Sequence, residues 1–165
     1  GCGADVLAII DEHNQAFLIV IVSRNLNRSL MKLYFDHEKL AAYQLSIELV
    51  AWVTNVLETI PKSLAVHDQL DRASTSIPLN IAEGNGKFTP PDRCRYFDNA
   101  RGSALECAAA LDVVVAKKKA TPAQIEPGKE CLHRIVSTLV GLIRSNSPDR
   151  LHEDSVEYRV TRRKK

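Results

Sequence analysis

The sequence predicts an all-α protein, an antiparallel up-down-up-down four-helix bundle over residues 35–146. Three observations support this. Apolar residues in this range recur at spacings of three, four and seven, the period of amphipathic helices. Prolines and glycines divide the pattern into four segments of roughly 20–28 residues, and short connections make consecutive helices antiparallel neighbours. Aromatic residues make up only 5% of the 165 residues, a composition that suits helix packing better than a β-sandwich.

The first two helices are bounded by prolines and glycines. The apolar period begins at Phe35 and continues to Ile60, and Pro61 stops the first helix. The second helix is expected from about Leu64 to Glu83, where Gly84 and Gly86 end it. Pro78 lies inside this second helix, and we expect a kink there because proline removes one backbone hydrogen bond.

The third and fourth helices share a start signal of threonine followed by proline. Thr89 precedes a third helix expected over residues 90–118, and Thr121 precedes the fourth. Lysines 117–119 lie at the C-terminal end of the third helix, where its dipole favours positive charge. Because Pro127 and Gly128 interrupt the early part of the fourth helix, its regular portion is expected to begin only near Lys129.

The helical period also selects a core. Nine apolar residues are predicted to be buried between the helices: Leu40, Val53, Leu70, Ile77, Ile81, Leu105, Leu111, Ile135 and Leu139. The four cysteines, Cys2, Cys94, Cys107 and Cys131, form no CxxC pair and have no histidine at metal-ligand spacing. We therefore expect reduced thiols in a cytoplasmic protein with no bound metal, and we place Cys107 and Cys131 in the core.

Two segments lie outside the predicted bundle. Residues 1–34 are an N-terminal extension whose residues 16–22, AFLIVIV, form an apolar run too short to cross a bilayer. This β-branched run favours a strand or a self-associating edge. The single methionine is Met31, so we expect the native protein to begin near it, with a genuine short accessory element as the alternative. Residues 147–165 are polar, end in RRKK and are expected to be disordered.

Polar residues on the second and third helices form the candidate site. Those on the second helix are spaced four, four and three apart, which places them on one stripe. The predicted network comprises Arg72, Ser76, Asn80 and Glu83 with Gly102, Ser103 and Glu106. We expect Arg72 to pair with Glu106, Asn80 to bond backbone groups near the kink, and Gly102 and Ser103 to allow close helix approach. The favoured interpretation is a network that fixes helix register or a subunit interface, and a ligand or nucleic-acid role is the alternative.

The same residues bear on catalysis. Acid–base chemistry needs two carboxyl groups that converge in a pocket, and Glu83 and Glu106 are the candidates. No nucleophile, metal set or phosphate-binding loop accompanies them in the sequence. We therefore expect neither enzymatic activity nor a cofactor, and a hydrolase that uses one of these glutamates is the remote alternative.

Four motifs carry a resemblance to a known family. They are Phe35-x-x-x-Lys39-Leu40, Asp71-Arg72-Ala73, Ser76-Ile77-Pro78-Leu79-Asn80-Ile81-Ala82-Glu83-Gly84 and Ala100-Arg101-Gly102-Ser103-Ala104-Leu105-Glu106. Over about residues 35–146 the chain resembles the bacterial four-helix-bundle proteins encoded in intervening sequences of large-subunit ribosomal RNA genes. That family includes the accessory variability determinant of diversity-generating retroelements. The resemblance implies a small cytosolic bundle, often a pentameric ring, without known catalysis. In the retroelement branch it implies a basic surface that contacts nucleic acid and the reverse transcriptase.

The charge distribution departs from that basic branch. Residues 35–146 hold 13 basic and 13 acidic side chains, and the net charge of +2 comes from residues 147–165. A neutral bundle lacks the counterion release that dominates non-specific nucleic-acid binding. Arg93, Arg95 and Arg101 are the candidate contacts to RNA or DNA, and a solvated helix face is the alternative. Two hypotheses remain, a homo-oligomer that binds nucleic acid or a processing partner, and a purely structural or protein-interaction module.

Overall fold

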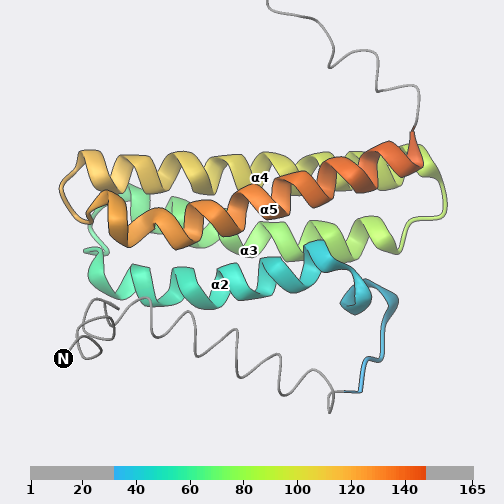
Figure 1. Ribbon diagram of the computed structural model, residues 1–165, viewed down its shortest axis with the longest axis horizontal. Coiled ribbons are helices and arrows are strands. Elements are labelled where there is room, and N and C mark those ends of the chain that lie inside the picture. Colours follow the sequence, from blue (N-terminus) through green and yellow to red (C-terminus); the bar gives the residue numbers. More distant parts are fainter. Residues whose placement is uncertain (1–31, 148–165) are drawn as a thin grey trace, which may run out of the picture.

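The computed structural model describes residues 32–147, and these residues form a bundle of helices (Figure 1). A short 3₁₀ helix, η1 (Asp36–Lys39), precedes four α-helices: α2 (Ala41–Thr59), α3 (Ala65–Asn85), α4 (Pro90–Ala116) and α5 (Pro122–Asn146). Each helix packs against the next one in the chain, and α5 closes the bundle against α2. The predicted four-helix bundle is therefore confirmed. The predictions for the apolar run and the polar tail concern residues outside this described part.

The helix starts follow the chemistry expected from the sequence. The Thr89 hydroxyl accepts a hydrogen bond from the Asp92 N–H at 3.4 Å, which caps α4. Thr121 and Gln124 form a reciprocal capping box at the start of α5. The first helix differs from the prediction, because α2 begins at Ala41 and not at Phe35. Leu40 has an extended backbone (φ −73°, ψ 127°), which separates η1 from α2.

The predicted late start of α5 is wrong. The helix runs without a break from Pro122, and Pro127 lies inside it. Ile125 and Cys131, on either side of this proline, are both buried in the core. Their packing keeps α5 helical across Pro127 although this proline lacks a backbone donor, because tertiary packing outweighs local propensity. In the same way α3 continues through the buried Pro78.

The core lies between the four helices and contains most of the predicted residues. Seven of the nine are buried, namely Val53, Leu70, Ile77, Ile81, Leu111, Ile135 and Leu139. Leu40 is partly buried and packs against this cluster. The prediction for Leu105 is wrong, since 50% of its surface is exposed. Ala104, Cys107 and Leu111 occupy the inward positions of α4, and a rotation of 100° per residue turns Leu105 outward.

The cysteines of the described part are buried, as expected for Cys107 and Cys131. Burial raises the pKa of both thiols to about 12, so they stay protonated at neutral pH. The Cys131 Sγ donates to the Leu45 carbonyl across the α5–α2 contact at 3.6 Å. Among residues 32–147 no three potential ligands gather around a metal position. None of the helices in that range has the length and hydropathy needed to cross a membrane.

Candidate functional site

A chain of hydrogen bonds joins the middle of α3 to the middle of α4. The Asn80 amide donates to the Ser76 Oγ at 3.0 Å and to the Ser76 carbonyl at 2.9 Å. The Ser76 and Ser103 hydroxyls lie 2.9 Å apart, and the Ser103 Oγ donates to the Asn99 carbonyl at 3.1 Å. Each hydroxyl can therefore donate once and accept once, in the order Asn80, Ser76, Ser103, Asn99. Such a satisfied network favours one register of the two helices.

The charged residues of the predicted network lie outside this chain. Arg72 donates to the Gln69 Oε1 of its own helix at 2.7 Å, and Arg72 and Glu106 are both exposed. The predicted pair between them is therefore wrong. Glu106 follows Ser103 by three residues, so it is rotated by about 60° away from the α3 contact. A shallow depression on the outside of α3 is lined by Asp71, Arg72, Thr75, Ser76, Leu79 and Asn80.

Glu83 belongs to a separate cluster near the end of α3. Its carboxylate lies 3.0 Å from the Lys87 Nζ, and the Lys87 ammonium lies 4.7 Å from the Tyr96 ring centroid. The Tyr96 hydroxyl and Lys87 lower the pKa of the Glu83 carboxyl below its ordinary value. A carboxylate held ionised in this way is poorly suited to donate a proton in acid–base chemistry.

The close helix approach predicted at Gly102 is also wrong. A Cβ placed on Gly102 would meet nothing within 4 Å. The tight contacts lie at Gly84, where a Cβ would lie 2.9 Å from the Tyr96 Cβ and the Phe97 ring, and at Gly128, where it would overlap the Trp52 indole. Gly84 follows Ile77 by seven residues, and this spacing is the sequence signal that places it on the buried face of α3.

The outer side of α4 carries an unexpected apolar stripe, which we call the outer α4 stripe. It consists of Gly102, Leu105, Ala109 and Val113, spaced three, four and four apart, and all four are exposed. Leu105 and Val113 are 50% and 40% exposed. Between Gly102 and Ala116 the acidic residues of α4 are Glu106 and Asp112. The Asp112 carboxylate pairs with the Lys129 ammonium at 2.7 Å. The stripe therefore resembles the buried side of a helix more than a solvated one.

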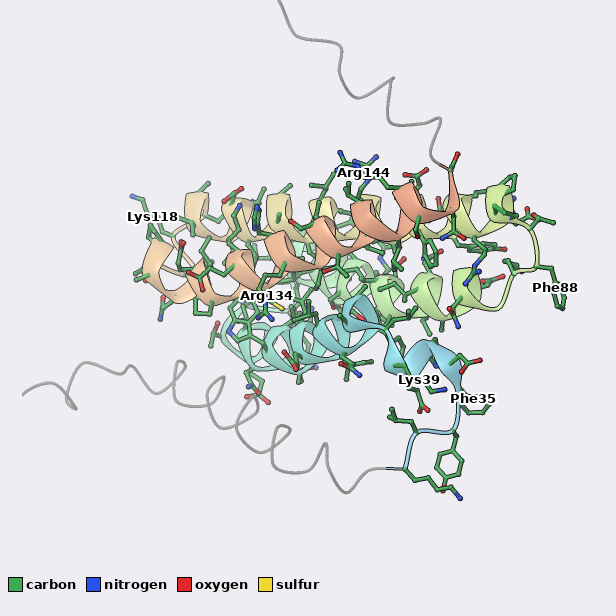
Figure 2. The ribbon with its side chains drawn as sticks, turned by 45° about the vertical axis from the view of Figure 1, so that its right-hand side comes forward. Phe35, Lys39, Phe88, Lys118, Arg134 and Arg144 are labelled. Atoms are coloured by element: carbon green, nitrogen blue, oxygen red, sulfur yellow. The ribbon has the colours of Figure 1, made fainter. Side chains whose placement is uncertain are left out.

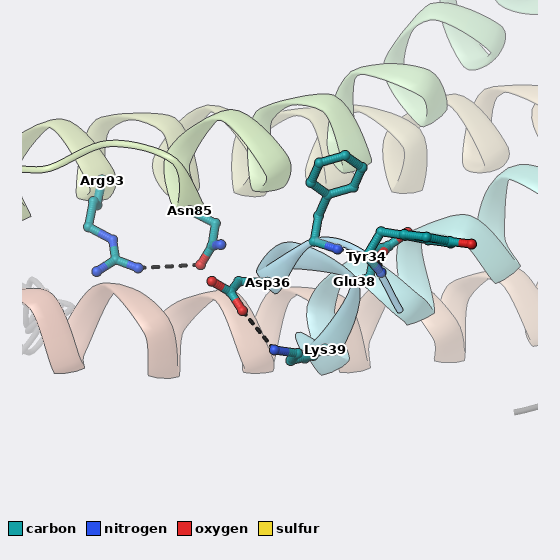
Figure 3. Close-up of polar contacts among 7 residues, drawn as sticks. Tyr34, Asp36, Glu38, Lys39, Asn85 and Arg93 are labelled. Atoms are coloured by element: carbon teal, nitrogen blue, oxygen red, sulfur yellow. Dashed lines mark hydrogen bonds and ion pairs between the residues drawn. The ribbon is translucent and has the colours of Figure 1, made fainter. Parts of the chain in front are cut away.

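The three candidate arginines do not gather on one face. Residues 93 and 95 are about 160° apart around a helix, and residues 95 and 101 about 120° apart. Arg95 pairs with Asp92 at 3.7 Å, Arg101 pairs with Asp98 at 3.6 Å, and Arg93 donates to Asn85 at 3.3 Å. Figure 3 shows the contact between Arg93 and Asn85. Two of these arginines thus have an acidic partner on α4 itself, and the third bonds a neutral amide of α3.

Unpaired positive charge lies instead at the turn between α4 and α5. Lys117, Lys118 and Lys119 are all exposed, and Lys118 adopts a left-handed backbone with φ of 56°. None of the three lysines forms an ion pair with any residue of the part that the structure describes. Figure 2 shows Lys118 at the opposite end of the bundle from Phe88.

The fold and the site define a class, an all-α bundle in which a chain of hydrogen bonds joins two helices and an apolar stripe is exposed. The chain belongs to the 23S rRNA-intervening sequence protein family, whose sequence model matches residues 38–141. This confirms the resemblance carried by the four motifs. The crystal structure of a protein of unknown function from the S23 ribosomal protein family of Bacteroides thetaiotaomicron is similar, with a TM-score of 0.60 and 21% identity. The match covers 63% of this chain and 99% of that one, and at this identity it supports the fold alone. No curated protein matches the chain.

Proposed function

We propose that the protein is a non-enzymatic assembly protein that forms a homo-oligomer through the outer α4 stripe. The observation that carries this proposal is the exposed apolar surface of Leu105 and Val113 on a helix whose opposite side is already buried. A helix that carries apolar residues on its outward side as well as toward the core can bury that outward side against a partner. α3 and α5 cover one side of α4, and a partner would cover the other.

A second copy of the chain is the occupant that we favour. Residues 35–146 carry equal numbers of basic and acidic side chains, so two bundles do not repel each other by net charge. The ion pair between Asp112 and Lys129 removes one of the two acidic charges beside the stripe. The family resemblance implies rings of identical subunits, and a pentamer is the assembly that we expect. In a ring every subunit contacts two neighbours, so each subunit buries more surface than a single helix face provides.

Charged substitutions in the stripe are expected to dissociate the oligomer. Replacing Leu105 and Val113 with aspartate places two charges in each contact and removes two apolar side chains, each worth roughly 1.5–3 kcal/mol when buried. We expect association to weaken at least about 100-fold. Sedimentation velocity should then show a mass near the 18.3 kDa of one chain, while circular dichroism shows unchanged helical content.

Leu33 offers a matched control, because it is 48% exposed and lies outside the stripe. Leu33→Asp should leave the mass of the oligomer unchanged. If the parent protein itself sediments as a single chain at all concentrations, the proposed function is wrong. If the oligomer survives both aspartate substitutions, it forms through another surface.

A second candidate function is the binding of RNA or DNA, favoured by the three unpaired lysines at the α4–α5 turn. In a ring, symmetry would place one such lysine cluster on every subunit, and their fields would add. The internal pairs of Arg95 and Arg101 make these arginines weaker candidates than the sequence suggested. The same lysine cluster is our proposed binding surface for a nucleic-acid-processing protein, such as the reverse transcriptase that the resemblance implies for one branch.

Reversing these lysine charges should weaken binding to nucleic acid. The triple variant Lys117→Glu, Lys118→Glu, Lys119→Glu is expected to bind labelled RNA and DNA at least about tenfold more weakly, with a smaller salt dependence. Fluorescence anisotropy at about 50 and 200 mM salt measures both quantities.

The matched control reverses three lysine charges that have internal partners, in Lys39→Glu, Lys87→Glu and Lys129→Glu. An equal loss in this control would assign the binding to net charge and not to the turn. A loss on deletion of residues 162–165 alone would assign it to the RRKK tail. Absence of binding by the parent protein at the lower salt would exclude this second function.

A further inference from the structure

The outer side of α2 is the second apolar surface that the bundle leaves without a helix against it. Of the 19 residues of α2, two are charged, Glu48 and Glu58. We call Tyr43, Ile47, Val50, Ala51 and Thr54 the outer α2 face. On an α-helix these positions lie roughly 100–200° away from Leu49, which is buried in the core. They are half-buried or exposed, and Ile47, Val50 and Ala51 lie outside the cluster that fills the bundle.

This face has no neighbour among the helices. α2 packs against α3 on one flank and α5 on the other, and α4 lies across the diagonal of the bundle. A surface helix usually turns charged and polar residues toward water on the side opposite the core. Between Tyr43 and Thr54 the outer α2 face offers a threonine and a tyrosine but no charge. The outward side of α2 is thus an uncharged strip from Tyr43 to Thr54, bordered by Gln44, Glu48 and Asn55 and followed by Glu58.

We propose that residues 16–22 of the same chain, AFLIVIV, dock on the outer α2 face. These seven residues carry no charge and no polar side chain, so they match an uncharged apolar surface and bring no ionic group into the contact. An exposed stretch of this kind is a liability for a soluble protein. Docking would cover both apolar surfaces at once.

The path of the chain places this segment within reach of α2. The chain enters the described part at Lys32 and continues into η1, which contacts α2. The Glu38 Oε2 accepts hydrogen bonds from the Tyr34 and Phe35 N–H groups at 2.6 and 2.7 Å. Figure 3 shows Tyr34 and Glu38 next to each other. The Gln44 amide of α2 donates to the Glu38 carbonyl at 2.7 Å. These bonds hold the incoming chain beside the N-terminal end of α2, on the side seen below η1 in Figure 1.

The remaining linker is long enough for the whole face. Residues 23–31 span at most roughly 30 Å when extended. The 19 residues of α2 give a helix about 28 Å long. Because the segment is tethered, its effective concentration at the face is of millimolar order. A second copy of the chain lacks this advantage, so the chain's own segment is the favoured occupant. This inference makes residues 16–22 a genuine accessory element, and it does not depend on the outer α4 stripe.

Hydrogen exchange of the full-length protein tests this proposal. In the parent protein we expect the backbone amides of residues 16–22 to exchange at least about tenfold more slowly than in an unstructured peptide. Ile47→Asp should bring them to within about twofold of the unstructured rate, with helical content unchanged. Leu79→Asp makes the same kind of change at an exposed position of α3, outside both apolar surfaces, and should leave the protection intact.

A second variant approaches the contact from the other side and cannot disturb the bundle core. Ile19→Asp should raise hydroxyl-radical labelling of Tyr43 and Ile47 severalfold. Exchange of residues 16–22 at the unstructured rate in the parent protein would overturn the proposal. So would protection that persists in Ile47→Asp, or protection that depends on protein concentration, since the latter would make a second copy the occupant.

Discussion

Replacing Phe97 with alanine is expected to lower the free energy of unfolding by about 3–5 kcal/mol, the range measured for buried Phe-to-Ala substitutions. Phe97 is 1% exposed and is among the largest fully buried side chains of the bundle. Its ring lies against Gly84, so it fills the contact between α3 and α4. Removal of the ring leaves a cavity that the surrounding helices can fill only in part. Urea denaturation followed by circular dichroism measures the loss.

Phe88 supplies the control for this prediction, because it is the same residue type in a fully exposed position. It lies between α3 and α4 at the end of the bundle, where Figure 2 shows its side chain pointing away from the helices. Phe88→Ala should change the free energy of unfolding by no more than about 0.5 kcal/mol. Similar losses in both variants would contradict the assignment of Phe97 to the core.

The second large effect is expected at Gly128. Gly128→Ala should destabilise the fold by about 1–3 kcal/mol, because it forces extra volume into a packed contact. The added Cβ would overlap the Trp52 indole, which is buried between α2 and α5 and cannot swing into solvent. Thermal unfolding measures the change, and a shift of several degrees is expected for a domain of this size.

Gly141 lies in the same helix and gives the matched comparison. A Cβ at this position would meet nothing within 4 Å. Gly141→Ala should therefore stabilise the protein by roughly 0.5–1 kcal/mol through the higher helix propensity of alanine. If both glycine substitutions shifted stability in the same direction, the contact with Trp52 would not explain why position 128 requires a glycine.

The sequence predicted the helices well because the signals for them are local. The apolar period, the capping threonines Thr89 and Thr121 and the proline at 61 each act within a few residues. The effect of Pro127 was misjudged because α5 is stabilised there by the burial of Ile125 and Cys131 in a core shared with other helices. A local rule cannot include that contribution.

The candidate site was predicted in part. Ser76, Asn80 and Ser103 form the expected polar contact between α3 and α4. The spacing of residues assigns each to a side of its own helix, but it does not give the rotation of that helix relative to its neighbour. One step along a helix rotates a side chain by 100°, and this step separates Ser103, in the contact, from Gly102, which faces solvent. The pair predicted between Arg72 and Glu106 was wrong for the same reason.

The sequence by itself determined the number of helices, their order, their approximate ends and the family. These depend on periodicity and capping, which are properties of short segments. Only the tertiary structure decided which glycines leave no room for a Cβ and which apolar residues face outward. A Cβ at Gly84 would clash with Phe97, and one at Gly128 would clash with Trp52, whereas Leu105 has no helix of residues 32–147 opposite it. Each of these facts depends on which side chains of other helices lie opposite the residue. Such contacts join residues that are far apart in the chain, and they exist only once the four helices have packed.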